Sequence, residues 1–263
     1  MRVPIFQIDA FAAHRFGGNP AAVMPLPAFL DDGTLQAIAA ENNLAETAFL
    51  VRRGAEWQLR WFTPAVEVPL CGHATLASSW VVMERLDPGA DRVVFHTLSG
   101  ALTVRRSGAA FVMDFPARPT SPVEPPPALE AALGVRPLEV LHDGFNYVAV
   151  LAAAETVRRL APDLRAIREL AGVDGVIVTA RGDGGYDCVS RYFAPAKGID
   201  EDPVTGGAHC ALAPFWSARL GKSEVRAFQA SARGGEMICR VAGERVELEG
   251  SCVFYLEGAA EIP

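Results

Sequence analysis

The sequence predicts a mixed α/β protein made of two similar halves, and three observations lead to this prediction. The first is an internal repeat: RWFTPA, which starts at Arg60, is matched by RYFAPA, which starts at Arg191. Further on, HATLA from His73 is matched by HCALA from His209. The second is a proline-rich segment, FPARPTSPVEPPP, near the middle of the chain. The third is a helix-length apolar stretch in each half, which is typical of a buried helix.

The proline-rich segment marks the boundary between the halves. Its six prolines, between Phe115 and Pro127, disfavour a helix interior or a central strand and fit an extended connector. We expect an N-terminal half over residues 1–117, completed by a C-terminal strand near 254–263, and a C-terminal half over residues 118–253. The two repeat blocks are offset by 131 and 136 residues, which places five extra residues within Lys197–Thr205.

In the N-terminal half, the opening segment MRVPIFQIDAF has the composition of a strand. An amphipathic helix is expected from Asp32 to Asn42. The aromatic run Leu59–Phe62 predicts a strand that ends at the proline two residues later, and a buried helix is expected over Ala74–Leu86. Alternation predicts a hairpin of two strands, Leu102–Arg106 and Phe111–Phe115.

The C-terminal half repeats the order of strand, glycine turn and buried helix. Val189–Phe193 predicts the strand, and Cys210–Leu220 predicts the helix, which ends at Gly221. Before them a helix is expected over Thr156–Leu170, with Pro162 breaking its first turn. The other strands expected here are Tyr147–Leu151, Gly175–Thr179, Val225–Ser231, Met237–Val241 and Arg245–Leu256.

The composition argues against several classes of protein. The formal net charge of −7 counts against a nucleic-acid groove or an anionic membrane surface. No apolar run approaches the ~18 residues of a membrane span, and the N-terminus lacks the features of a signal peptide. The five cysteines are scattered, with no C-x-x-C pair, which is not typical of a disulfide framework or a zinc site. We expect a soluble cytoplasmic protein with no nucleic-acid or membrane partner.

A glycine turn opens each buried helix, as Cys71-Gly72-His73 and as Thr205-Gly206-Gly207. Such a turn directs unpaired backbone N–H groups and the positive end of the helix dipole outward. It can therefore hold a carboxylate, a phosphate or a developing oxyanion. The alternative is that the glycines serve packing alone.

Glu46 and the two histidines of the repeat are candidate proton-transfer groups. Glu46 lies among apolar residues, so its pKa should be raised if it points inward, as general acid–base catalysis requires. The alternative is an outward-facing glutamate on a strand. His73 and His209 lie near helix N-termini, which lower the pKa of histidine and favour a neutral imidazole. The alternative for both is a histidine held by backbone groups.

Asp202 and Cys71 each have a catalytic and a structural interpretation. Asp202 precedes Pro203 and acts either in the chemistry or as a turn cap. Cys71 is either a reactive thiolate, because a helix N-terminus lowers the pKa of a thiol, or a small buried residue. No Asp/Glu/His cluster has metal-ligand spacing along the sequence, so no metal is expected.

Four separated motifs resemble the PhzF-like phenazine-biosynthesis isomerase family. They are GNPAAV from Gly18, NLAETAF from Asn43, CGHAT from Cys71 and EDPVTGGAHC from Glu201, and QASARGG from Gln229 resembles a late glycine motif of the same family. The resemblance implies a diaminopimelate epimerase-like fold. In that fold each half is a barrel-like, mostly antiparallel sheet around a central helix, and the active site lies between the halves.

The resemblance also implies a cofactor-free proton shift on a small carboxylated substrate, as in trans-2,3-dihydro-3-hydroxyanthranilate isomerase. Glu46, His73 and Asp202 match the family's catalytic residues, and Asp202 should meet the other two from the opposite half. The residues implied in substrate binding are Gly72, Gly206, Gly207, Asn19 and Cys71. A homodimer is implied as well.

One departure from the family pattern keeps other functions open. Gly207 stands where the family usually has a serine, so one side-chain hydrogen bond to the substrate is lost. The alternatives are an amino-acid epimerase or racemase, with Glu46 opposed by Asp202 or Cys71, and a non-catalytic protein of the same fold that binds small acids. Fold alone does not decide among them.

Overall fold

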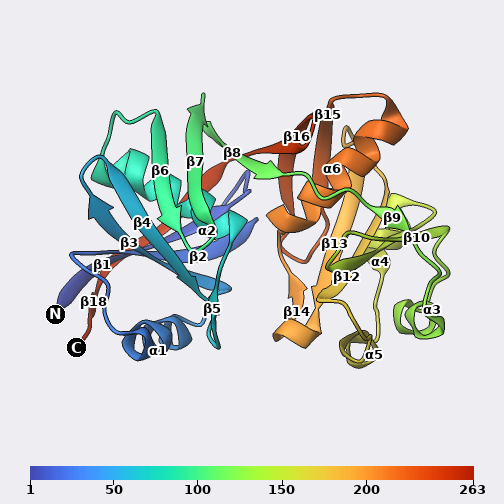
Figure 1. Cartoon of the computed structure of the whole chain (residues 1–263), viewed down its shortest axis with the longest axis horizontal. Helices are drawn as coiled ribbons and strands as arrows, with labels where there is room; N and C mark the ends of the chain where they lie inside the picture. The colour runs from blue at the N-terminus through green and yellow to red at the C-terminus, as the bar shows by residue number, and fades with distance from the viewer. The chain divides into compact units, whose positions relative to one another are not determined.

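The computed structural model describes residues 1–263, which form two compact units (Figure 1). Unit 1 comprises Met1–Asp114 and Glu249–Pro263, and unit 2 comprises Phe115–Leu248. The chain leaves unit 1 after Asp114, three residues before the boundary expected after residue 117. It returns to unit 1 at Glu249, before the expected residue 254. Each unit has its own hydrophobic core. None of the helices is long and apolar enough to cross a membrane.

The sheet of unit 1 is mostly antiparallel and uses both ends of the chain. Strand β1 (Arg2–Ala10) pairs antiparallel with β18 (Cys252–Glu261) and with β2 (Asn19–Leu26). The remaining strands are β3 (Glu46–Arg53), β4 (Glu56–Phe62), β5 (Glu67–Val68), β6 (Arg92–Thr97), β7 (Gly100–Ser107) and β8 (Ala110–Pro116). The pairs β2–β3 and β4–β6 are parallel, and the pairs β3–β4, β4–β5, β6–β7 and β7–β8 are antiparallel.

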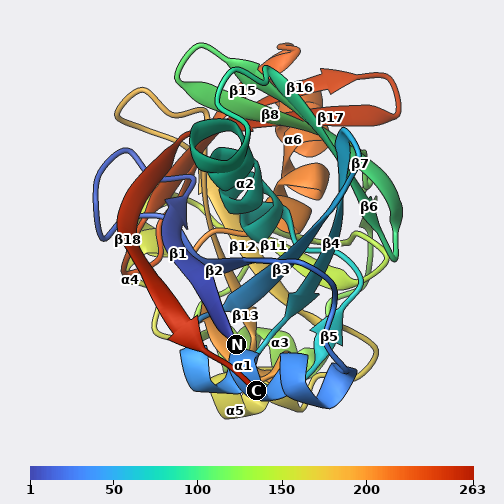
Figure 2. The ribbon, with the colours of Figure 1, turned by 90° about the vertical axis from the view of Figure 1, so that its left-hand side faces the viewer.

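Helix α2 (Gly72–Val81) lies inside the curl of this sheet and is buried along almost its whole length (Figure 2). It packs on β1, β2 and β3, so its N-terminal turn lies near the strand ends that carry polar residues. The α-helix was expected over Ala74–Leu86, but α2 ends at Val81 and the chain continues as a π-helical turn over Val82–Leu86. Helix α1 (Asp32–Asn42) has the bounds expected from the sequence and contacts β3 and β4.

Unit 2 has a mixed sheet with more helical connections. Strands β11 and β12 pair in parallel, as do β13 and β15, and the pairs β12–β13, β13–β14 and β15–β16 are antiparallel. Helix α6 (Gly206–Leu220) is the buried helix and packs on β15 and β16. The strands are β9 (Ser121–Pro122), β10 (Glu139–His142), β11 (Asn146–Val150), β12 (Gly175–Arg181), β13 (Cys188–Ala194), β14 (Ile199–Asp202), β15 (Glu224–Gln229), β16 (Gly235–Ala242) and β17 (Arg245–Gly250), which ends in unit 1. The shorter helices are α3 (Pro127–Leu133), α4 (Ala154–Arg159) and α5 (Leu164–Arg168).

Three further expected elements differ in the structure. The helix expected over Thr156–Leu170 is two helices, because Pro162 interrupts it and Asp163 caps α5 by accepting from two backbone N–H groups. The second buried helix begins at Gly206 rather than Cys210, since the glycine turn forms its first turn. The long strand expected after Arg245 is divided between β17 and β18.

The strand registers define which residues of the two units correspond. Trp61 pairs with Val68 across β4 and β5, and Tyr192 pairs with Asp202 across β13 and β14. The segment EVPLCG, which leads into α2, therefore matches EDPVTG, which leads into α6. This corrects the match of HATLA to HCALA: His73 corresponds to Gly207, two residues before His209.

Candidate active site

Four of the predicted site residues meet in unit 1. Asn19 and Glu46 begin the parallel neighbours β2 and β3, while Cys71 and His73 lie at the first turn of α2. Nε2 of His73 lies 2.9 Å from Oε2 of Glu46. Nδ1 of His73 lies 3.2 Å from Nδ2 of Asn19 and 3.5 Å from Sγ of Cys71. All four side chains are buried.

The structure decides that Glu46 points inward, with only 7% of the residue exposed. Its Oε2 atom is buried and lies 2.9 Å from Nε2 of His73, which pairs with it. A buried carboxylate is suited to accept a proton from a bound molecule.

The charge on His73 differs from the sequence expectation of a neutral ring. Burial by itself lowers the pKa of His73, but Cys71 and the carboxylate of Glu46 outweigh burial and hold the pKa well above its ordinary value. The Cys71 thiol is itself protonated at neutral pH, because burial and the Glu46 charge raise its pKa to about 11. The Glu46 carboxylate is therefore the group that keeps the proton on His73 near neutrality.

The raised pKa of Cys71 favours the structural interpretation of this residue over a reactive thiolate. The ligand atoms of Glu46, Cys71 and His73 nevertheless lie within 4.8 Å of one another, which is close enough to hold a metal ion. Spacing along the sequence concealed this group, because Glu46 reaches the other two only through the packing of α2 on β3.

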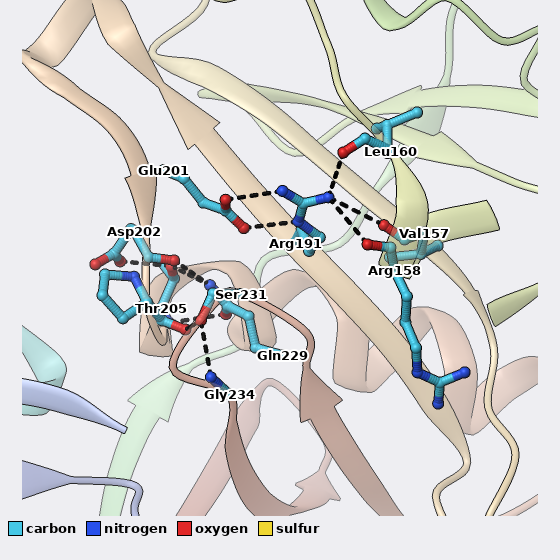
Figure 3. Close-up of polar contacts among 11 residues, drawn as sticks. Val157, Arg158, Leu160, Arg191, Glu201, Asp202, Thr205, Gln229, Ser231 and Gly234 are labelled. Atoms are coloured by element: carbon cyan, nitrogen blue, oxygen red, sulfur yellow. Dashed lines mark hydrogen bonds and ion pairs between the residues drawn. The ribbon is translucent and has the colours of Figure 1, made fainter. Parts of the chain in front are cut away.

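In unit 2, Asp202 is held by a network of side-chain hydrogen bonds (Figure 3). Thr205 Oγ1 donates to a carboxylate oxygen of Asp202. Gln229 Nε2 donates to the backbone oxygen of Asp202 at 2.7 Å, and Gln229 Oε1 accepts from the backbone N–H of Thr205 at 2.9 Å. Ser231 Oγ donates to the backbone oxygen of Pro203 at 2.8 Å. The QASARGG segment thus braces the turn that leads into α6.

Gly207, at the N-terminus of α6, lies beside a charged group that the sequence did not reveal. A Cβ atom at this position would be 3.4 Å from Nη1 of Arg118. The Arg118 guanidinium also lies over the Phe145 ring, 4.7 Å from its centroid. Arg118 belongs to the proline-rich segment, where no local pattern marks it as a site residue.

His209 is a structural residue, which was one of the two interpretations of the sequence. Its Nδ1 atom donates to the backbone oxygen of Thr205 at 2.8 Å, and the side chain is fully buried. Burial lowers the pKa of His209 to about 4, so the ring is neutral. Thr75, its counterpart in unit 1, makes the same bond to the backbone oxygen of Cys71.

The titratable cluster of unit 1 has no counterpart in unit 2. Thr47 pairs with Phe62, and Val176 pairs with Phe193, so Gly175 holds the place of Glu46. A Cβ atom at Gly175 would collide with the backbone oxygen of Phe193, which excludes any side chain there. By the same correspondence, Thr205 replaces Cys71 and Gly207 replaces His73.

Comparisons with known proteins agree with the motifs. A family model described as phenazine biosynthesis-like protein matches residues 8–258. The chain belongs to the phenazine biosynthesis-like family. An uncharacterized isomerase of Pseudomonas aeruginosa is 50% identical, with both chains covered completely. The crystal structure of a PhzF family protein from Enterococcus faecalis has a TM-score of 0.96 at 41% identity and covers 100% of each chain.

Family membership confirms the predicted fold class and enzyme class. A hydroxyproline epimerase from Agrobacterium vitis shares the fold, with a TM-score of 0.60 at 12% identity over 98% of this chain and 92% of that one. Three of the similar curated proteins are named isomerases, and the chain is an isomerase of the phenazine biosynthesis-like family. The expected meeting of Asp202 with Glu46 and His73 stays a prediction, since these residues belong to different units.

Proposed function

We propose that this enzyme moves a proton between two carbons of a small carboxylated substrate and that Glu46 carries the proton. The observation that carries the proposal is the difference between the units: a buried carboxylate in unit 1 is replaced by Gly175 in unit 2. A racemase with two opposed bases needs one base on each face of the substrate. A proton shift on one face needs only one.

In the proposed mechanism, the Glu46 carboxylate removes a proton from one substrate carbon and becomes the neutral acid. The same proton then passes to a second carbon, the double bond moves, and the carboxylate is restored. The His73 imidazolium, 2.9 Å away, stabilises the carboxylate before and after the transfer. Burial of both groups keeps out water that would otherwise exchange with the proton.

Substrate binding is proposed for the two glycine turns and the groups around them. The backbone N–H groups of Gly72, at α2, and of Gly206 and Gly207, at α6, are donors suited to carboxylate and carbonyl oxygens. Arg118 adds a positive charge beside the second turn. Asn19 orients His73, and Asp202 completes the catalytic set from unit 2. We propose that the reaction needs no cofactor and occurs in the cytoplasm.

Asp202 keeps the epimerase as a second candidate, because it is a carboxylate with only 9% of the residue exposed. Its carboxylate already accepts a hydrogen bond from Thr205. Cys71 is a weaker candidate for the second base, since its pKa is about 11. The non-catalytic alternative is favoured only by the glycine at position 207.

The test is solvent-deuterium labelling followed by NMR. We expect trans-2,3-dihydro-3-hydroxyanthranilate, or another unsaturated acid from a panel, to show a moved double bond with partial retention of the transferred proton. Inversion of a labelled stereocentre would establish the epimerase instead, and thermal stabilisation without any exchange would establish the binding protein. Glu46→Gln should lower the rate at least ~10²-fold, while Cys71→Ser should leave it nearly unchanged. An inactive Cys71→Ser variant together with an active Glu46→Gln variant would overturn the proposal.

A further inference from the structure

An arginine–glutamate pair occupies the same place in both units. Arg60 and Arg191 begin the two copies of the repeat, and Glu67 and Glu201 each lie five residues before the glycine that starts a buried helix. Nε and Nη2 of Arg60 donate to the two carboxylate oxygens of Glu67, each at 2.7 Å. Arg191 donates to Glu201 through the same atoms, at 2.7 and 2.8 Å (Figure 3).

The two pairs share more than the ion contact. Each guanidinium lies over the phenylalanine two residues later, Arg60 at 5.1 Å from the Phe62 centroid and Arg191 at 4.8 Å from the Phe193 centroid. The arginine side chains are 20% and 12% exposed. A planar group that is stacked on one face and bound through two parallel hydrogen bonds has a fixed orientation, which a lysine cannot reproduce.

Each arginine also ties its strand pair to a neighbouring helix. Nη1 of Arg191 donates to the backbone oxygen of Leu160 at 2.6 Å and to that of Val157 at 3.3 Å, at the end of α4. In unit 1, Nη2 of Arg60 donates to Asp32, in the first turn of α1, at 2.8 Å. The arginine thus connects three elements: its own strand, the strand that carries the glutamate, and a helix.

The segment between the glutamate and the buried helix is short and stiff. In both units it reads x-Pro-x-x before the glycine, and proline fixes its own backbone angle φ. The position of the glutamate therefore determines the position of the glycine turn. In unit 2 this segment carries Asp202 and Thr205, and in unit 1 it ends at Cys71.

We propose that Arg60–Glu67 and Arg191–Glu201 are matched clamps that set the two glycine turns. Arg191 and Glu201 are then positioning residues for Asp202 and for the backbone donors of α6. The arginine–glutamate pair is present in both units although Glu46 of unit 1 is replaced by Gly175 in unit 2. We therefore attribute to the clamp a role that both glycine turns need, the positioning of the turn. Its effect on turnover rests on the proposed function, whereas its effect on the turn does not.

The test compares Arg191→Lys and Glu201→Gln with a matched control, Arg158→Lys. The Arg158 side chain also forms a two-contact ion pair in unit 2, with Asp183, and only the backbone oxygen of Arg158, which the substitution keeps, accepts from Arg191. In the full-length protein without ligand, hydrogen–deuterium exchange of residues 199–209 should be at least ~10-fold faster in both clamp variants and unchanged in the control. Arg60→Lys should do the same to residues 65–75.

A second measurement separates positioning from general stability. The substrate for this measurement is the acid that the wild type is found to label with deuterium. With it, Arg191→Lys and Glu201→Gln should lower kcat per folded molecule at least ~10-fold and change KM less. Their melting temperatures should be close to that of Arg158→Lys. Exchange at residues 199–209 equal to that of Arg158→Lys would overturn the proposal, as would faster exchange spread over all of unit 2. If the wild type exchanges no acid, the proposed function fails, and the ligand-free comparison still decides the clamp.

Discussion

Replacing Gly207 with serine tests the geometry around the N-terminus of α6. The structure has room for the side chain, since a Cβ atom would lie 3.4 Å from Nη1 of Arg118, the flexible end of a side chain. The backbone at Gly207 is not in the left-handed region, so serine adopts it without strain. Glycine in a helix costs about 0.5–1 kcal/mol relative to alanine, and we expect Gly207→Ser to leave the free energy of unfolding unchanged or raised by about 0.5 kcal/mol.

The added hydroxyl should also change affinity. A hydrogen bond to a charged group contributes about 1.5–3 kcal/mol, which corresponds to a factor of about 10–150 in Kd. Calorimetric titration with trans-2,3-dihydro-3-hydroxyanthranilate, in a Glu46→Gln background that stops turnover, should therefore show binding tightened at least ~10-fold. The matched control is Gly175→Ala, whose methyl group collides with the backbone of Phe193 and should destabilise unit 2 by about 1–3 kcal/mol.

Two results would refute this reasoning. A loss of more than about 2 kcal/mol in Gly207→Ser would mean that the space beside Arg118 is absent. An unchanged Kd in a stable Gly207→Ser protein would mean that this turn does not contact the carboxylate of the ligand. The first result concerns packing and is read from urea unfolding, whereas the second concerns the substrate-binding proposal and is read from the titration.

Three further predictions concern pH, metal ions and assembly. The free energy of unfolding should fall by about 3 kcal/mol between pH 6.5 and pH 4, because the pKa of His209 is lowered to about 4 in the folded protein and the unfolded chain therefore binds a proton more readily. Urea unfolding of His209→Gln should lack this decrease. His73 acts in the opposite direction, since its raised pKa gives stability that is present below pH 6.5 and lost as the pH rises through the raised pKa. EDTA should leave deuterium exchange unchanged, while Zn²⁺ should inhibit the wild type more than Cys71→Ser, whose sulfur ligand is gone. Light scattering should give a homodimer of the 28.1 kDa chain, as the family resemblance implies, and a monomer at micromolar concentration would remove that expectation.

Much of the fold could be predicted because its signals are local. The strand expected at Val189–Phe193 lies inside β13, and α1 has its expected bounds, since alternation and capping act over a few residues. Pro162 breaks the helix as expected, but it separates α4 from α5 rather than distorting one turn. The repeat was visible because aromatic and proline positions recur in order.

The site was predictable only in part, because its contacts are long-range. The alignment of His73 with His209 from the sequence alone is wrong by two residues. The first residues of α2 and α6 correspond, so His73 corresponds to Gly207. The approach of Glu46 to His73 depends on the packing of α2 on β3, which no sequence spacing encodes. Arg118 is a third case, because only the packed structure brings it beside α6.

The two units share the structure around the glycine turn but differ in their titratable groups. What both units keep is the frame of the site: a buried helix, a glycine turn at its start, and an arginine–glutamate pair behind the turn. What differs is the proton chemistry, since Glu46 and His73 in unit 1 are replaced by Gly175 and Gly207 in unit 2. Gly175 cannot carry a side chain without a movement of Phe193, so the packing of unit 2 excludes a carboxylate at the place of Glu46. Under the proposed mechanism, the base therefore comes from unit 1, at a position where the two units differ.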